Sequence, residues 1–166
     1  MPLAARIGKK GAFAAAMGAA AVLSLFFFRL EPSELGWLFA LQALVSVAAG
    51  VVLPLLWSMY ADIVDYEEYR SGRRPTGLIF SSSSMSQKLG WALGGAVTGW
   101  LLAAFGYDQS AAVQSGEAIA GVRLMMSWFP AAGCLLAAAA VLFYPLGEKR
   151  MERITTELNL RRKTNE

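Results

Sequence analysis

The sequence predicts an all-α integral membrane protein with four membrane-spanning helices and a polar C-terminal tail. Hydrophobic residues make up 56% of the 166 residues and charged residues only 16%, whereas soluble domains carry about 25% charged residues. The charged residues also cluster, and they separate four apolar runs at residues 11–28, 36–60, 78–105 and 124–146. Each run reaches the roughly 17–25 residues that a helix needs to cross a bilayer. The tail, residues 147–166, is polar and is expected to be helical.

The first run, Gly11 to Phe28, follows a basic segment, residues 1–10, and contains no charged residue. A secretory signal peptide is the alternative, since it also combines a basic start with an apolar core. This core exceeds the usual length of about 7–15 residues, and no A-x-A cleavage site follows it. The sequence therefore favours a retained helix.

The second and fourth runs carry aromatic residues near their ends, as membrane helices do at the two interfaces. Trp37, Trp57 and Tyr60 border the second run, whereas Trp128 and Tyr144 lie towards the ends of the fourth. Each of these two runs also contains a proline, which membrane helices tolerate as a kink.

The third run, residues 78–105, contains four closely spaced glycines. They form two small-xxx-small pairs, a pattern that lets a second membrane helix approach closely. We expect helix packing at Gly90, Gly94, Gly95 and Gly99.

The distribution of basic residues predicts the orientation. Four spans place both termini and residues 61–77 on one side of the membrane, with twelve basic residues against two on the other side. Because loops rich in Lys and Arg remain in the cytoplasm, both termini are expected to be cytoplasmic, in the inner membrane. The twelve are Arg6, Lys9, Lys10, Arg70, Arg73, Arg74, Lys149, Arg150, Arg153, Arg161, Arg162 and Lys163, and the two are Arg29 and Arg123.

Several classes of function are excluded. The chain has no histidine and one cysteine, Cys134, which leaves no His/Cys metal site, Ser-His-Asp triad or disulfide framework. No nucleophile–base pair lies in an apolar run, so we expect no enzyme, no cofactor and no metal site. The basic residues lie between apolar runs, which indicates a lipid bilayer rather than nucleic acid as the partner.

Lys88 is the only charged residue in the third run. It lies ten residues beyond Leu78, or about 15 Å along a helix axis, close to the middle of a hydrocarbon core about 30 Å thick. A charge at that depth costs roughly 2.5–3.5 kcal/mol on insertion scales and usually faces a cavity or a partner. A structural lysine paired with a carbonyl or carboxylate is the alternative to a lysine that faces a water-filled pathway.

A polar stripe accompanies Lys88. Steps of three and four residues place Ser81, Ser84, Lys88, Trp91 and Gly95 on one helix face. Donors for hydroxyl groups beside an aromatic ring are typical of a sugar-binding surface. Serines alone would be weak evidence, because serine often bonds its own helix carbonyls.

An acidic cluster, Asp62, Asp65, Glu67 and Glu68, follows the second run. The expected cationic partners are Arg70, Arg73 and Arg74, which come shortly after it. The cluster is either a solvated loop with ion pairs worth about 0–1 kcal/mol each or a cytoplasmic gate whose pairs break and re-form.

The segment WSMYADIVDYEEYRSGRRPTGLIFSSSSMSQKLGWALGGAVTGWLLAAFGY resembles the tenth and eleventh helices of the glycoside–pentoside–hexuronide:cation symporters. The best-known member of this family, which belongs to the major facilitator superfamily, is the melibiose carrier. RIGKK resembles the loop before the ninth helix of the family, and GVRLMMSWFP with LFYPLGEKR resembles its twelfth helix and tail. The resemblance implies that the chain is equivalent to the last four helices of a twelve-helix carrier.

The resemblance also implies roles for single residues. Lys88 matches a lysine close to the sugar and coupling-cation sites, and Ser84 matches a hydroxyl near the sugar. Asp62 and Arg74 match positions of the family's cytoplasmic gate, and we also expect Asp65 of the same acidic cluster in that gate. The coupling ion would be sodium or a proton, and its site would lie mostly in the N-terminal half, which this chain lacks.

Two functional hypotheses follow. In the first, the chain is the C-terminal fragment of a sugar:cation symporter that works by alternating access, with the missing N-terminal helices as its partner and a sugar or glycoside as its substrate. In the second, it is a four-helix membrane protein that does not transport and serves as a partner subunit or a relic.

Overall fold

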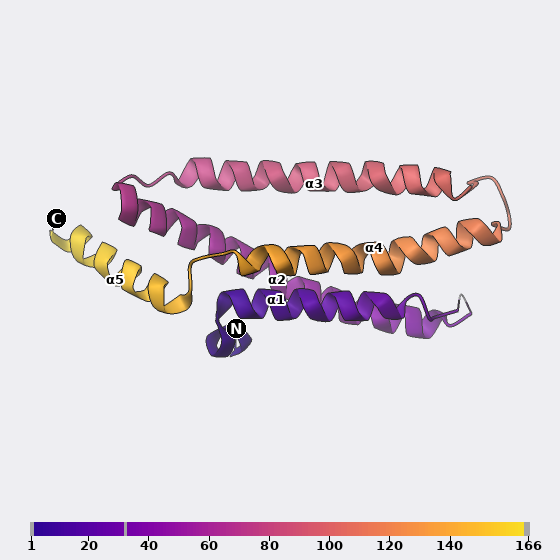
Figure 1. Cartoon of the computed structure of the whole chain (residues 1–166), viewed down its shortest axis with the longest axis horizontal. Coiled ribbons are helices and arrows are strands. Elements are labelled where there is room, and N and C mark those ends of the chain that lie inside the picture. The colour runs from indigo at the N-terminus through magenta and orange to yellow at the C-terminus, as the bar shows by residue number, and fades with distance from the viewer. Residues whose placement is uncertain (1, 32, 165–166) are drawn as a thin grey trace.

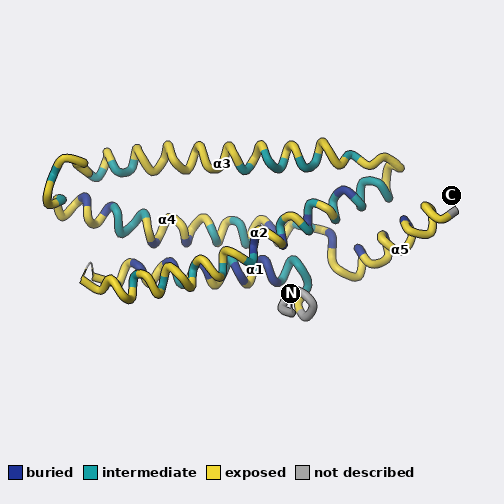
Figure 2. The backbone as a smooth tube through the Cα atoms, turned by 180° about the vertical axis from the view of Figure 1, so that it is seen from behind, coloured by how far each residue is buried: buried dark blue, intermediate teal, exposed yellow. Residues whose placement is uncertain are grey.

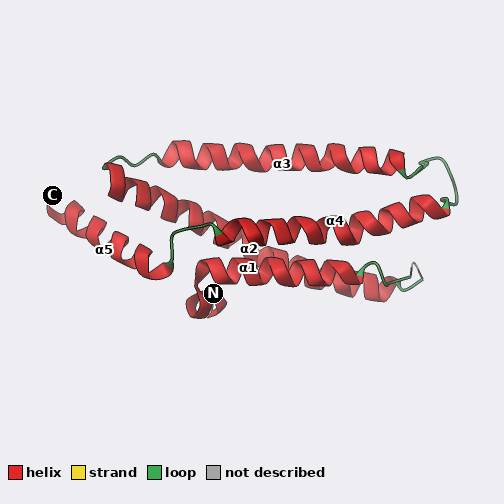
Figure 3. Cartoon of the chain, in the orientation of Figure 1, coloured by secondary structure: helices red, strands yellow, loops and turns green. Residues whose placement is uncertain are grey.

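In the computed structural model, the described chain folds into five α-helices and contains no strand (Figure 3). The backbone is described for residues 2–31 and 33–164, and the side chains for residues 7–31 and 33–163, so the last two residues of the predicted tail lie outside the description. The helices are α1 (Pro2–Phe26), α2 (Leu35–Ser71), α3 (Thr76–Ala104), α4 (Gly116–Leu142) and α5 (Glu148–Thr164).

The four long helices alternate in direction along the chain (Figure 1). The α2–α3 connection and α5 lie towards one end of the molecule, and the α1–α2 and α3–α4 connections lie at the other. This arrangement matches an even number of membrane crossings. Figure 1 also shows that α2 extends past the start of α1 towards α5.

The core lies between α1, α2 and α4. Ala12, Phe13 and Ala16 of α1 pack with three buried residues of α2 and with Val141 of α4. Alanines at this interface allow the helix backbones to approach closely, as small residues do in membrane bundles. The residues from α2 are Val52, Leu55 and Met59.

Helix α3 has no buried residue, and Figure 2 shows exposed and intermediate positions along its whole length. Near its start, Phe80 stacks on Trp57 of α2 with ring centroids 5.6 Å apart. Just past its end, Phe105 packs against Gly121 of α4. Most of the surface of α3 is therefore free to contact groups outside this chain.

Three helical segments are long and apolar enough to cross a membrane, namely Ile7–Phe26, Leu35–Ser71 and Gly116–Leu142. These correspond to the first, second and fourth predicted spans. Helix α3 has 29 residues but is not among them, since its serines, glycines and Lys88 lower its hydropathy. The predicted count of four spans stays a prediction.

The helices that carry the second and fourth predicted spans begin or end outside the apolar runs. Residues 61–71 were expected to lie in a loop, but α2 continues through the acidic cluster to Ser71. It ends as Gly72 adopts a left-handed conformation with φ of 71° and donates its N–H to the Glu68 carbonyl at 2.9 Å. Helix α4 begins at Gly116 rather than at residue 124, because the Ser115 hydroxyl accepts a hydrogen bond from the Ala118 N–H.

The tail is helical as expected, and it packs on the part of α2 that carries the acidic cluster. Met151, Ile154 and Leu158 form one apolar stripe of α5 and are buried. They contact Ile63, Tyr66 and Tyr69 of α2. On the same surface the guanidinium groups of Arg150 and Arg161 lie over the rings of Tyr66 and Tyr69, with centroid distances of 5.0 and 5.1 Å.

Ile154→Asp is expected to detach α5 from α2, because it places a charge in this buried stripe. An isolated helix of 17 residues is only marginally stable in water, so limited proteolysis should then cleave the tail much faster. The matched control is Thr155→Asp, which adds the same charge at an exposed neighbouring position. Equal cleavage rates in the two variants would contradict the packing of α5.

Candidate functional site

Lys88 lies near the middle of α3, where the sequence places it. Its side chain is exposed, and it forms no hydrogen bond or ion pair with any residue whose side chain the structure describes. Within the described part of this chain, the alternative of a structurally paired lysine therefore has no partner to support it.

The polar stripe of α3 has the predicted geometry. Because α3 is one continuous helix, residues three and four apart share a face. Trp91 on that face is 75% exposed. The hydroxyl of Ser81 donates to the Leu78 carbonyl at 3.1 Å, whereas Ser84 has no such bond to its own helix among the described contacts. Ser84 is therefore better placed than Ser81 to offer its hydroxyl to a ligand.

The four glycines of α3 face open space. A Cβ atom added to Gly90, Gly94, Gly95 or Gly99 would meet no atom within 4 Å. No helix of the described chain packs against them, so the close packing predicted for them requires a helix from outside this chain.

One residue of α3 was missed by the sequence analysis. The Nε2 atom of Gln87 is enclosed but has no hydrogen-bond partner within the described residues. An unsatisfied amide costs about 1–3 kcal/mol. The only available signal was an amide side chain in an apolar run.

A second cluster of charges lies at the cytoplasmic end of the predicted topology. Lys9 of α1 binds both carboxylate oxygens of Asp62 of α2, with Nζ–O distances of 2.7 and 2.8 Å. The next residue, Lys10, donates to the carbonyls of Leu142 and Tyr144 at 2.6 and 3.3 Å. A cation there satisfies carbonyls at the C-terminal end of α4. It is also stabilised by the negative end of the helix dipole. Two adjacent lysines thus connect α1 to α2 and to α4.

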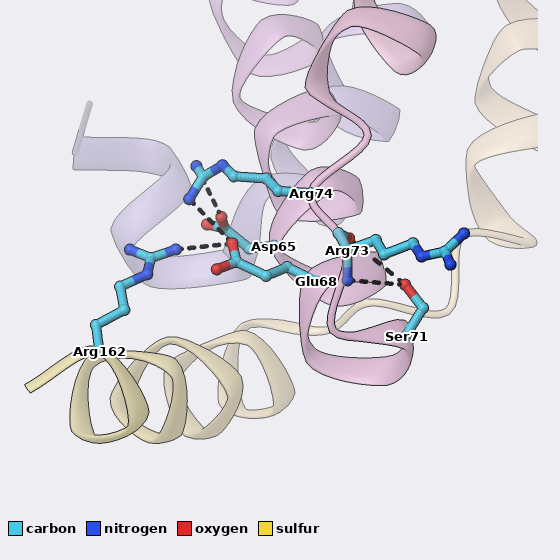
Figure 4. Close-up of polar contacts among 6 residues, drawn as sticks. All are labelled: Asp65, Glu68, Ser71, Arg73, Arg74 and Arg162. Carbon is cyan, nitrogen blue, oxygen red and sulfur yellow. Dashed lines mark hydrogen bonds and ion pairs between the residues drawn. The ribbon is translucent and has the colours of Figure 1, made fainter. Parts of the chain in front are cut away.

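Glu68 connects three segments (Figure 4). Its carboxylate accepts from Arg74 of the α2–α3 connection at 3.0 Å and from Arg162 of α5 at 2.7 Å. Arg74 also pairs with Asp65 at 3.2 Å. The end of α2, the α2–α3 connection and the end of α5 therefore share one ionic network.

The predicted partners of the acidic cluster are only partly correct. Arg74 pairs as expected, but Arg70 and Arg73 form no ion pair within the described chain. The backbone N–H of Arg73 instead donates to Ser71 Oγ (Figure 4). Asp62 pairs with Lys9, whereas Arg74 pairs with Asp65 and Glu68. Lys9 and Arg162 were missed as partners because they lie 53 and 94 residues away in the chain.

Asp62→Lys is expected to destabilise the chain, because it places a third cation beside Lys9 and Lys10. The loss should be roughly 1 kcal/mol, the scale of a partly exposed pair. The double variant Lys9→Asp/Asp62→Lys restores opposite charges and should recover most of it, measured by thermal unfolding in detergent. If the double variant is no more stable than the single one, the Lys9–Asp62 pair contributes nothing.

Comparisons with known proteins agree with this architecture. Residues 1–148 match the model of the family described as MFS/sugar transport protein. The chain belongs to this family. It is therefore an integral membrane protein of a transporter family rather than an enzyme, which confirms the resemblance seen in the sequence.

Curated proteins that are similar to this chain come from bacteria. A glucuronide carrier protein homolog of Escherichia coli is 34% identical over 99% of this chain and 36% of its own length. A putative glycoside/cation symporter of the same organism is 36% identical over 94% of this chain and 34% of its own length. An isoprimeverose transporter of Lactiplantibacillus pentosus is 43% identical over 59% of this chain and 20% of its own length.

The chain spans about a third of the length of the first two of these relatives. No solved structure matches it. Among the described residues, no group of three or more Asp, Glu, Cys or His side chains is placed to hold a metal ion.

Proposed function

We propose that this chain forms the C-terminal four helices of a sugar:cation symporter in the cytoplasmic membrane. The observation that carries the proposal is the uncovered face of α3, on which Lys88 lies exposed. The chain that presents this face belongs to a sugar transport family. A cation at the middle of a spanning helix requires a water-filled pathway or a partner. The other helices of the carrier would supply both.

The substrate is a glycoside or a related carbohydrate. Lys88 and Ser84 would donate hydrogen bonds to sugar hydroxyls. Ser81 would do so after its hydroxyl gives up the hydrogen bond to the Leu78 carbonyl. The exposed ring of Trp91 would contact the apolar face of the sugar. The printed names of the relatives, which include a glucuronide carrier homolog and a glycoside/cation symporter, support this substrate class.

The coupling ion is sodium or a proton. Helix α3 contains no carboxylate, so the groups that bind the ion would come mostly from the N-terminal helices of the carrier. Lys88 would contribute charge close to that site. The same helices would pack on Gly90, Gly94, Gly95 and Gly99.

Alternating access requires contacts that break on one side of the membrane. Asp62, Asp65 and Arg74 would form the cytoplasmic gate of this half, together with Lys9 and Arg162. The excess of basic residues at this end supports cytoplasmic termini. Each pair is partly exposed and hence weak, which suits contacts that must open repeatedly.

Reconstitution in lipid vesicles tests the proposal. Uptake of labelled α- and β-glycosides is measured for this chain alone and beside an eight-helix complement from a related carrier, with and without a sodium or proton gradient. We expect insertion without transport for the chain alone and gradient-dependent uptake with the complement. If neither the chain alone nor the chain with an inserted complement takes up glycoside, the second hypothesis, a membrane protein that does not transport, would be favoured.

A further inference from the structure

A cavity of about 310 Å³ lies at the end of the bundle opposite α5. It is an open cavity bordered by the α1–α2 connection, the start of α2, the α3–α4 connection and the first turns of α4. Most of its wall is apolar, with Phe27, Leu38, Val122 and Met126 among the lining side chains. Its volume is at the lower end of the roughly 300–1,000 Å³ that ligand pockets occupy.

Two opposite charges line this cavity, Glu31 from the α1–α2 connection and Arg123 from the second turn of α4. Neither side chain forms an ion pair or a hydrogen bond with any other residue of the described chain. A carboxylate and a guanidinium therefore remain available to a ligand that also fills an apolar space.

The cavity lies at the level where the membrane spans end. The apolar segment of α1 ends at Phe26, and α2 and α4 begin beside it. Phe28 and Trp37 nearby are 47% and 69% exposed, as aromatic residues are at a bilayer interface. The abundant molecules at this depth are phospholipids, which combine an acyl chain with a charged headgroup.

We propose that this cavity binds a phospholipid whose headgroup carries both a phosphate and a primary ammonium, as phosphatidylethanolamine does. Part of one acyl chain would occupy the apolar cavity. The phosphate would accept hydrogen bonds from Arg123, a pairing that guanidinium geometry favours. The ammonium would donate to Glu31, whereas phosphatidylglycerol offers Glu31 no cation and phosphatidylcholine offers it no N–H donor.

Native mass spectrometry of the purified chain tests the site. The chain in detergent is mixed with phosphatidylethanolamine, phosphatidylcholine or phosphatidylglycerol of identical acyl chains. We expect phosphatidylethanolamine to be retained best, and Arg123→Gln to weaken its binding by about tenfold or more, since hydrogen bonds to charged groups are the strong ones. Arg29→Gln is the matched control, because Arg29 lies in the α1–α2 connection, two residues from Glu31, but does not line the cavity.

Two further variants test each end of the lipid. Glu31→Gln should shift the preference from phosphatidylethanolamine to phosphatidylglycerol, and Glu31 lies in an exposed connection where the change does not threaten folding. Val122→Trp fills the cavity and should release the lipid while helical content stays unchanged. Unaltered retention in Arg123→Gln or Val122→Trp, or loss of the lipid when the eight-helix complement binds, would overturn the proposal.

Discussion

Lys88→Ala in the completed carrier is expected to reduce sugar uptake to background without reducing membrane insertion. The charge lies mid-helix on an exposed face of α3, and an ion at that depth is retained only where it has a role. Its removal should favour insertion slightly, because the cost of a charge in the bilayer is removed. The measurement is gradient-driven uptake in vesicles, normalised to the amount of inserted protein.

Two controls make this result specific. Lys163→Ala removes a cation at the exposed end of α5 and should leave uptake unchanged. Lys88→Arg keeps the charge but replaces the compact ammonium with a planar guanidinium. We expect this variant to retain partial uptake, because the positive charge remains. Normal uptake by Lys88→Ala would reduce Lys88 to a structural residue.

Gly121→Ala is expected to destabilise the chain by about 1–3 kcal/mol or more, the cost of overpacking. A Cβ atom at Gly121 would overlap Cβ and Cγ of Phe105. Those atoms lie close to the backbone of the α3–α4 connection and cannot move aside as the tip of a flexible side chain can. The measurement is thermal unfolding in detergent, followed by far-UV circular dichroism.

The matched control lies in the same helix. A Cβ atom at Gly133 would meet nothing within 4 Å, so Gly133→Ala should be neutral or stabilising by up to about 1 kcal/mol, the helix preference of alanine over glycine. In a double-mutant cycle, Phe105→Gly, which also removes the overlapping Cβ atom of residue 105, should remove most of the penalty of Gly121→Ala. Equal stability of the two single variants would show that Phe105 does not press on Gly121.

Hydropathy predicted the helices of this fold well but placed their ends poorly. The apolar runs identify α1, α2 and α4, because a spanning helix must satisfy its backbone internally and expose apolar side chains. The same criterion failed at residues 61–71, since acidic residues continue a helix as readily as they occupy a loop. Ser115, followed by an acidic residue in the first turn of α4, was an available start signal that hydropathy overlooked.

The candidate site was predictable where it depends on one helix and not where it depends on several. Helical spacing places Lys88, Ser84 and Trp91 on one face, because that relation is local. No local pattern shows that Lys9 binds Asp62 or that Arg162 binds Glu68, since helix packing determines those distances. In the proposed carrier, the surroundings of Lys88 would depend on helices outside this chain.

The length of α2 has a mechanical consequence. Its 37 residues extend about 55 Å, well beyond a hydrocarbon core of about 30 Å. Pro54 offers a flexible point, and Ser71 lies about 26 Å beyond it along the axis. A 10° swing there would displace the far end by roughly 4.5 Å, more than the length of any ion pair it carries. In the proposed carrier, α2 would act as a lever that amplifies a small rearrangement at membrane depth into the opening of the Glu68–Arg162 contact with α5.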